Sequence, residues 1–395
     1  MTDADAQARA AGRLAGWAFD GAVRGVSRVH WQIAGRAFDS IGPSAESARR
    51  RHDTVSALAY AAVRGVGTGV LAGAGTLAGA IGARRGAQSE TTAGREALAA
   101  LNGLIGDRLS DEHNPLALDM SLRQETRSVG CDRASLAAAH PDATGRVVLF
   151  AHGLMETERW WWPGDDGPDF GARLAADHGW TPVQLRYNTG RHVSDNAAAL
   201  DVLLDELVAG WPVPVTELAL VGHSMGGLIA RGAARQGADR GAEWTDALRQ
   251  VVCLGSPHRG ADLEKAVNIA GWALGAAAET RPFAELLELR SSGIKDMRFG
   301  YLGESDWAGR QADVLLDDHR GDCADLPGVN YHFVACTLTR ADGHLVGRLL
   351  GDVIVRTASA FDGRTTGSLT RLGGLHHFDL LTHPEVYQVL GDWLS

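Results

Sequence analysis

The sequence has few cysteines, and none is placed as a metal ligand or redox motif. Cys131, Cys253, Cys323 and Cys336 show no C-x-x-C spacing and no adjacent histidine, which excludes a zinc site and a thioredoxin-like motif. Cys253 and Cys336 lie in apolar runs and are predicted to be buried thiols, whereas a pairing of Cys131 with Cys323 stays open. Residues 1–13 are polar and lack the apolar core of a secretory signal peptide. These absences predict a reduced, cytoplasmic protein.

Positive charge is also scarce. Against 48 acidic residues the chain has 38 basic ones, a formal net charge of −10, and lysine occurs only at Lys265 and Lys295. The arginines are scattered along the chain. Because phosphate recognition needs clustered cations, nucleic acid is excluded as a partner. The hydrophobic content of 45% over 395 residues is that of a folded protein with one large domain and an appendage, or with two domains.

Residues 1–112 show helical periodicity and predict a helical appendage. Apolar side chains recur at three- and four-residue steps between Ala8 and Phe38. A further helix is predicted over about residues 93–109, with one apolar stripe. The residues of these stripes are Leu14, Trp17, Val26 and Ile33, then Leu98, Leu101, Leu104 and Ile105. Such stripes need a cover, which we expect to be the rest of the chain, a second subunit or a lipid surface.

The run Gly65–Ala83 in this appendage is free of charge and rich in glycine and alanine. Its length is near that of a membrane span, but glycine and alanine contribute little transfer free energy into lipid. Three interpretations stay open: close helix packing, peripheral membrane contact and a flexible linker. A nucleotide-binding loop is excluded because no strand precedes the glycines.

From about residue 113 strand and helix patterns alternate, which predicts a doubly wound α/β sheet with right-handed crossovers. The second domain is therefore predicted over 113–395, with a cap or lid at about 261–321. The predicted strands are 116–123, 147–151, 183–187, 218–221, 250–254 and 331–338, and the predicted helices are 194–209, 226–235 and 384–394.

The chain is organised around the stretch Leu218–Ala230, in which Ser224 is the centre of a G-x-S-x-G sequence. An apolar strand ends here and a helix begins at once, which is the arrangement of a nucleophile elbow. Such a turn leaves no room for side chains two residues before and after the serine, and Gly222 and Gly226 meet that demand. Ser224 is therefore the predicted nucleophile.

A serine hydroxyl also needs a base, an acid that orients the base, and donors for the oxyanion. The end of the strand at Ala151 predicts the Leu154 N–H as one donor, and the residue after the nucleophile, Met225, supplies the second. His152 is expected to support the loop rather than to act as a base. The predicted base lies in the loop before the last helix, where His377 is preferred to His376.

The orienting acid is expected between the serine and the histidine in the chain. Asp342 and Asp352 compete for this role, and we prefer Asp352 because the apolar run after it would hold it rigidly. A turn aspartate without catalytic role is the alternative for either residue.

These motifs together resemble bacterial lipase- and esterase-type α/β-hydrolases and the lipase domain of proteins similar to GPI inositol-deacylases. The motifs are His152-Gly153-Leu154, Gly222–Gly227, Ser256–Gly260, Gly351–Val355 and His377-Phe378-Asp379, and they span about residues 113–395. The resemblance implies an α/β-hydrolase fold with Ser224, Asp352 and His377 as the triad. The chain lacks the glycine that lipases have after the acid. Some secreted lipases bind calcium at an aspartate corresponding to Asp379, but the other ligands are not evident and no metal is predicted.

Substrate specificity is less clear from the sequence. Trp160 and Trp161 follow the oxyanion loop and are predicted to line the substrate pocket, although packing beneath the loop is an equal alternative. Trp272, in the predicted lid, is a third candidate. A lid of this kind suits apolar esters.

The sequence thus predicts a serine carboxylic-ester hydrolase that acts on a small-molecule or lipid ester and needs no cofactor. An acyltransferase or thioesterase with the same triad is the alternative. A non-catalytic scaffold on a lipid surface, docked through the N-terminal helices, is a weaker one. Oligomeric state and acyl chain length are not predicted.

Overall fold

The computed structural model describes residues 92–395 except 126, 165–166, 262–289, 311–317, 338–354, 356–358 and 362–364, together with scattered residues between 6 and 69. The chain divides into two units, of which one comprises Met1–Leu98, Glu112–Leu116 and Val267–Arg290. The other comprises Ala99–Asp111, Ala117–Ala266 and Ser291–Ser395 and contains the sheet. Residues Ala99–Asp111 thus belong to the unit of the sheet, and the predicted domain boundary at residue 112 stays a prediction.

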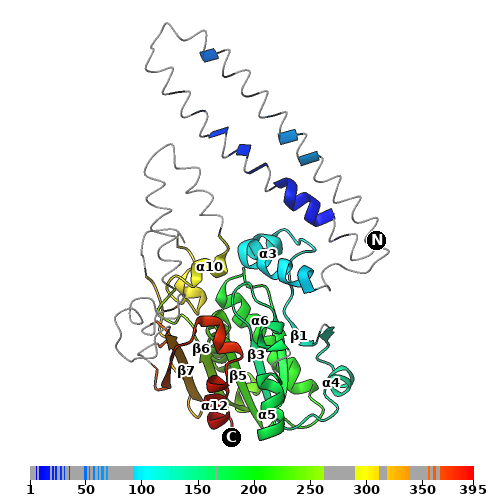
Figure 1. Cartoon of the computed structure of the whole chain (residues 1–395), viewed down its shortest axis with the longest axis vertical. Coiled ribbons are helices and arrows are strands. Elements are labelled where there is room, and N and C mark those ends of the chain that lie inside the picture. The colour runs from blue at the N-terminus through cyan, green and yellow to red at the C-terminus, as the bar shows by residue number, and fades with distance from the viewer. Residues whose placement is uncertain are drawn as a thin grey trace. The chain divides into compact units, whose positions relative to one another are not determined.

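The described strands form one eight-stranded sheet (Figure 1). They are β1 (Ser121–Gln124), β2 (Arg127–Val129), β3 (Arg146–Ala151), β4 (Thr181–Arg186), β5 (Glu217–His223), β6 (Leu248–Leu254), β7 (Asn330–Thr337) and β8 (Ser368–Gly373). Their order across the sheet is β2-β1-β4-β3-β5-β6-β7-β8. All neighbours from β4 to β8 are parallel, and β1 runs antiparallel to β2 and β4.

Helices cover both faces of the sheet. Successive residues of a strand point to opposite faces, so neighbouring strand residues contribute to two separate cores. Leu149 of β3 and Leu220 of β5 belong to a core that includes residues of α6 and α7. Their neighbours Phe150 and Val221 belong to a second core with residues of α5 and α12. The helices are α3 (Thr92–Asp111), α4 (Arg133–Ala139), α5 (Phe170–His178), α6 (Val193–Gly210), α7 (Met225–Arg240), α10 (Ser292–Asp296) and α12 (Pro384–Trp393). This arrangement confirms the predicted doubly wound α/β sheet.

Helix α3 buries mainly small and polar residues rather than its predicted leucine stripe. Its buried residues after position 98 are Ala99, Asn102, Gly103, Gly106 and Leu109, whereas Leu104 is 49% exposed. The predicted stripe is therefore not the buried face. The physical reason is close backbone approach, since a side chain on Gly106 would collide with the amide of Asn188.

In the other unit, the described residues before position 70 are helical. Asp20 pairs with Arg64, and a Cβ on Gly16 would lie 3.4 Å from the carbonyl oxygen of Thr68. Because Gly16 faces Thr68 while Asp20 faces Arg64, these two segments run antiparallel. No helix among the described residues is long and apolar enough to cross a membrane, and most of Gly65–Ala83 lies outside the described residues.

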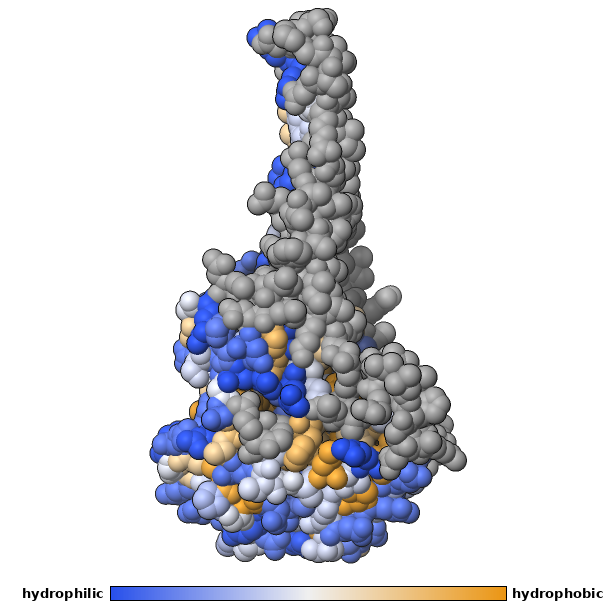
Figure 2. All heavy atoms as spheres, turned by 90° about the vertical axis from the view of Figure 1, so that its left-hand side faces the viewer, coloured by the Kyte–Doolittle hydropathy of each residue, from blue (hydrophilic) through white to orange (hydrophobic). Residues whose placement is uncertain are grey.

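The six predicted strands are present with shifted ends, except that β1 starts only at Ser121. Helices α6, α7 and α12 are also as predicted, whereas β2, β8, α4 and α5 were not foreseen. All four cysteines are described and form no disulfide, and Cys253 and Cys336 are buried as predicted. On the face shown in Figure 2, apolar and polar residues of the sheet's unit are interspersed.

Candidate active site

Ser224 occupies the sharp turn between β5 and α7. Its backbone has φ 51° and ψ −120°, a conformation that residues with side chains rarely adopt. Missing side chains make the turn possible, because a Cβ on Gly222 would collide with the backbone of Gly226. A Cβ on Gly226 would in turn collide with the carbonyl of Ala151 at the end of β3. The two glycines thus have the steric role that the sequence predicts.

The end of β6 brings His377 to this turn. The N–H of Ser224 donates to the carbonyl oxygen of Leu254 at 2.8 Å. The next residue is Gly255, where a Cβ would lie 3.1 Å from Cε1 and 3.2 Å from Nδ1 of the His377 imidazole. The predicted nucleophile and base therefore both lie against the end of β6, at the consecutive residues Leu254 and Gly255. A hydrogen bond between a nucleophile and its base is often long before substrate binds.

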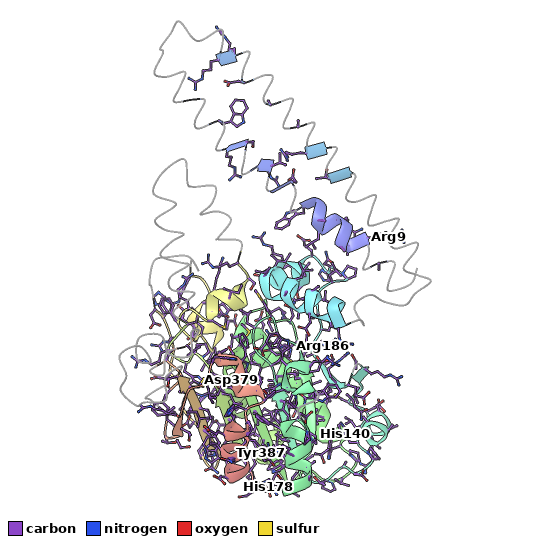
Figure 3. All side chains as sticks on the ribbon, in the orientation of Figure 1. Arg9, His140, His178, Arg186, Asp379 and Tyr387 are labelled. Carbon is purple, nitrogen blue, oxygen red and sulfur yellow. The ribbon has the colours of Figure 1, made fainter. Side chains whose placement is uncertain are left out.

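The two neighbouring histidines differ in their surroundings. His377 is 2% exposed, whereas the side chain of His376 is 56% exposed and its Nε2 lies 3.1 Å from Oδ1 of Asp379. The other oxygen of Asp379 accepts the backbone N–H of His376 at 2.8 Å. Asp379, labelled in Figure 3, therefore belongs to the turn that carries both histidines. Among the described residues no cluster of three ligating side chains is placed to hold a metal ion.

The loop after β3 carries the predicted oxyanion donor Leu154 and is fixed on both sides of it. The N–H of Gly153 donates to Oε2 of Glu156 at 2.6 Å. The N–H of Met155, whose φ is 60°, donates to the Thr189 hydroxyl at 3.2 Å. The second predicted donor, the Met225 N–H, lies in the first turn of α7, where N–H groups have no partner within the helix.

His152 supports this loop from within the core. Its Nδ1 donates to the carbonyl of Gly153 at 2.9 Å, and its ring stacks on Tyr187 with centroids 4.4 Å apart. The Tyr187 hydroxyl donates to the His152 carbonyl at 2.5 Å. Burial lowers the pKa of His152 and keeps its imidazole neutral.

Two buried residues that the sequence reasoning did not single out connect these parts. His223 directly precedes the nucleophile, and its Nδ1 lies 3.0 Å from Oε2 of Glu156. Its Nε2 lies 3.1 Å from the carbonyl oxygen of His377. Burial works to raise the pKa of the Glu156 carboxyl, but His223 and the Gly153 N–H hold it below its ordinary value. A histidine inside G-x-S-x-G and the first of two glutamates before a tryptophan run were the available signals.

The two tryptophans after the loop have different environments. Trp161 is 1% exposed and packs edge-on against Phe150 of β3, with ring centroids 5.0 Å apart. This position matches packing beneath the loop, which the sequence left open as an equal alternative to lining the pocket. Trp160 is 37% exposed and lies against Phe378, itself 40% exposed, with ring centroids 5.2 Å apart. An exposed aromatic pair therefore stands next to His377.

The remaining predicted site residues lie outside the described residues. They are the preferred acid Asp352, its competitor Asp342, and Trp272. Of the predicted lid, residues 262–289 and 311–317 are likewise outside, and the described part is 290–310, which includes α10, with the end residues 261 and 318–321.

Comparisons with known proteins found the following similarities. A family model described as PGAP1-like alpha/beta domain matches residues 184–273, which include β5, the nucleophile turn and α7. Mature lipase BlEst2 from Bacillus licheniformis is 17% identical over 63% of this chain and 92% of its own, with a TM-score of 0.43. Staphylococcus hyicus lipase is 12% identical over 64% and 95%, with a TM-score of 0.39. A search of curated proteins found no match.

The strand order and the serine turn after β5 are those of the α/β-hydrolase fold. Within that class, the chain is similar to the PGAP1-like domain and to bacterial lipases and esterases, as the sequence motifs predict.

Proposed function

We propose that the protein is a serine carboxylic-ester hydrolase with Ser224 as nucleophile, His377 as base and Asp352 as orienting acid. The observation that supports it most directly is the strained turn at Ser224 with a buried imidazole beside the adjoining strand end. A strained backbone such as that of Ser224, with φ 51°, costs free energy and typically persists at functional sites. Such strain is typical of a nucleophile presented to a substrate.

In the proposed reaction, the Ser224 oxygen attacks the ester carbonyl carbon while His377 takes the hydroxyl proton. The carbonyl oxygen becomes an oxyanion that accepts hydrogen bonds from the N–H groups of Leu154 and Met225. The imidazolium of His377 then gives its proton to the departing alcohol oxygen, which leaves an acyl-enzyme. Asp352 fixes the imidazole tautomer and stabilises the imidazolium.

In the second half of the reaction, water replaces Ser224 as the attacking nucleophile and Ser224 becomes the leaving group. His377 takes a proton from water as the water oxygen attacks the acyl carbon, and the oxyanion again occupies the two-donor site. Collapse of this intermediate returns the proton to Ser224 and releases the carboxylic acid.

We further propose that the acyl chain is apolar and lies against Trp160 and Phe378. Both side chains are more than a third exposed although they are aromatic, and Phe378 lies 5.6 Å from the His377 ring between centroids. An apolar acyl chain would cover these two rings and exclude water from the reacting ester. Trp272 would add to this surface from the lid.

The test is hydrolysis of p-nitrophenyl esters of graded acyl length, with an acyl-CoA thioester and an alcohol acceptor run in parallel. Ser224→Ala is expected to lower kcat by about 10⁶ in a protein that keeps its circular dichroism. Retention of a tenth of wild-type activity by Ser224→Ala would overturn the mechanism. Faster turnover of the thioester, or acyl transfer to the alcohol, would support the alternative chemistry with the same residues.

The identity of the acid is tested by a pair of matched variants. Asp352→Asn is expected to lower kcat by about 10⁴ because the amide favours the wrong imidazole tautomer. Asp342→Asn is expected to keep nearly full activity. The reverse order would assign the role to Asp342.

A further inference from the structure

His223 uses both ring nitrogens in contacts that call for hydrogen-bond donors. Nε2 lies 3.1 Å from the carbonyl oxygen of His377, and a carbonyl oxygen only accepts. Nδ1 lies 3.0 Å from Oε2 of Glu156, an oxygen that also accepts the N–H of Gly153 at 2.6 Å. A neutral imidazole has one N–H and can satisfy only one of these acceptors. A protonated imidazole satisfies both.

The pair lies where water cannot supply the missing partner. The side chain of His223 is 0% exposed and that of Glu156 is 3% exposed. A carboxylate buried in this way needs a counter-charge, and the only cationic group placed on its Oε2 by the described contacts is His223. The other ionisable groups around the two residues are His152, Tyr187, Glu158, Arg186 and His377. Glu158 is engaged by Arg186 at 2.7 Å, and His152 is neutral through burial.

The contacts of this pair join three separate parts of the proposed active site. Glu156 accepts the N–H of Gly153, the residue before Leu154 on the oxyanion loop. His223 is the residue before the nucleophile, and its second contact is the backbone carbonyl of His377. The connected residues are 67 and 154 positions apart in the chain.

We propose that Glu156 and His223 form a buried carboxylate–imidazolium pair that sets the position of the oxyanion loop relative to the base-bearing turn. Both are positioning residues, because they act through Leu154 and His377 without touching substrate. The positioning part rests on the proposed function, whereas the charge state of His223 does not.

The charge state is tested in the wild-type protein by nitrogen-detected NMR with ¹⁵N-labelled histidine. We expect one imidazole, assigned to His223 by its loss in His223→Gln, to keep protons on both nitrogens from pH 6 to pH 9, two units or more above the usual histidine range. In Glu156→Gln the same imidazole is expected to become neutral, with its proton retained on Nε2. A His223 that is neutral at pH 7 in the folded wild-type protein would overturn the proposal.

The positioning role is tested by kinetics with the ester that the wild-type protein turns over best. Glu156→Gln is expected to lower kcat by about 10- to 100-fold with KM changed less than threefold, because only the transition state uses the oxyanion donors fully. The double variant Glu156→Gln/His223→Gln is expected to lose no more than the worse single variant, since the two residues act as one unit. Glu156→Asp is expected to recover part of the lost kcat.

Asp201→Asn is the matched control, since Asp201 is a buried carboxylate on α6 that binds Arg240 and Trp244 away from the site. It is expected to lower the unfolding temperature while kcat stays within twofold of wild type. Equal loss of kcat in Asp201→Asn and Glu156→Gln would show a general stability effect and overturn the positioning role. If the wild-type protein hydrolyses no ester, the proposed function fails, while the NMR result still decides the charge state of the pair.

Discussion

At the scale of single residues, the adjacent histidines of η7 (His377–Leu381) and its N-cap offer a direct comparison. His377→Ala is expected to abolish ester hydrolysis, because the buried imidazole beside Gly255 is the proposed base. His376→Ala removes an exposed side chain whose partner is Asp379, and is expected to keep at least half of the activity. Initial rates on a short p-nitrophenyl ester measure both. A greater loss in His376→Ala would assign the base to His376.

Glu158 gives a second prediction, which concerns stability and pH. Its carboxylate binds Arg186 at two atoms and lies 3.8 Å from Arg123, all three side chains being less than a tenth exposed. Glu158→Gln is expected to lower the free energy of unfolding by about 3 kcal/mol at pH 7, because two arginines lose their buried counter-charge. Chemical denaturation of both proteins measures this difference.

The difference in the free energy of unfolding between wild type and Glu158→Gln should decrease as the pH falls. Burial works to raise the pKa of the Glu158 carboxyl, but Arg186 holds it below its ordinary value of 4.5. The stabilisation is therefore fully present above pH 4.5 and is lost as the pH falls below it through the folded-state pKa. Wild type and Glu158→Gln should thus converge in stability in acid. A difference that stays constant down to pH 3 would contradict the charge interaction as its cause.

The residues of the site differ in how far the sequence could predict them. Ser224 was predictable because the elbow imposes a local steric rule on Gly222 and Gly226, which a short stretch of sequence displays in full. The pairing of Glu156 with His223 was not, because it depends on a contact between residues 67 positions apart. Periodicity and composition carry no information on such a contact. The different burial of Trp160 and Trp161 likewise follows from a one-residue rotation of the short helix η3 (Glu158–Trp161).

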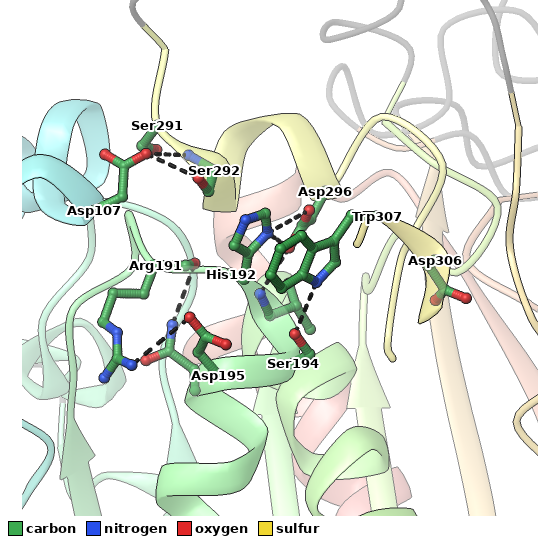
Figure 4. Close-up of polar contacts among 12 residues, drawn as sticks. Asp107, Arg191, His192, Ser194, Asp195, Ser291, Ser292, Asp296, Asp306 and Trp307 are labelled. Carbon is green, nitrogen blue, oxygen red and sulfur yellow. Dashed lines mark hydrogen bonds and ion pairs between the residues drawn. The ribbon is translucent and has the colours of Figure 1, made fainter. Parts of the chain in front are cut away.

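At the scale of elements, α3 is fixed to the sheet's unit by polar contacts as well as by close approach. Figure 4 shows Asp107 accepting hydrogen bonds from the backbone and the hydroxyl of Ser292, at 2.8 Å and 2.9 Å, at the start of α10. The hydroxyl of Ser291 donates to the carbonyl of Gly103 at 2.6 Å. The last turns of α3 therefore bind the start of α10, which lies within the predicted lid region.

This packing predicts the effect of a single methyl group. Gly106→Ala is expected to lower the free energy of unfolding by about 1–3 kcal/mol, because its Cβ would overlap the side-chain oxygen of Asn188. Asn188 also donates to the Gly106 carbonyl at 2.9 Å, so the two cannot separate without losing that bond. Thermal unfolding measures the change.

Leu104→Ala, two residues away on the exposed side of α3, is the matched control. At 49% exposure it is expected to change the free energy of unfolding by less than about 0.5 kcal/mol. If Leu104→Ala were the more damaging of the two, the leucine side of α3 would be its covered face.

The strands that could be predicted are those whose sequences are continuous apolar runs. β3, β5 and β6 are continuous apolar runs because both of their faces are buried in the two cores. β8, at the edge of the described sheet, has no fully buried residue and could not be distinguished from a loop. The buried face of α3 was mispredicted for a related reason, since it is built mainly from Ala99, Asn102, Gly103 and Gly106, and the predicted stripe lies elsewhere.

At the scale of the whole molecule, the division of the chain decides which truncation can survive. The sequence alone suggests that residues 1–112 hold no catalytic group, yet Ala99–Asp111 belongs to the unit of the sheet. Deletion of residues 1–91 is therefore expected to keep the turnover of a short soluble ester within about threefold of full length. Deletion of residues 1–112 removes α3 and its contacts with Ser291, Ser292 and Asn188, and is expected to give an unstable or inactive protein.

Both truncated proteins should be compared with the full chain by circular dichroism and by ester turnover at equal folded concentration. A folded, fully active protein without residues 1–112 would show that α3 is dispensable. An inactive but folded protein without residues 1–91 would show that the first helices are part of the active-site architecture.

The backbone conformation at Ser224 lowers the stability of the fold, although the proposed catalytic activity depends on it. A residue with a side chain at φ 51° and ψ −120° costs about 1–3 kcal/mol that glycine would not. Ser224→Gly is therefore expected to unfold at a higher temperature than Ser224→Ala, which keeps a Cβ in the same conformation, and neither variant has a nucleophile. Selection for thermal stability alone would favour glycine at this position and yield a more stable protein without hydrolase activity. Any programme that stabilises this chain must therefore screen for turnover at every round.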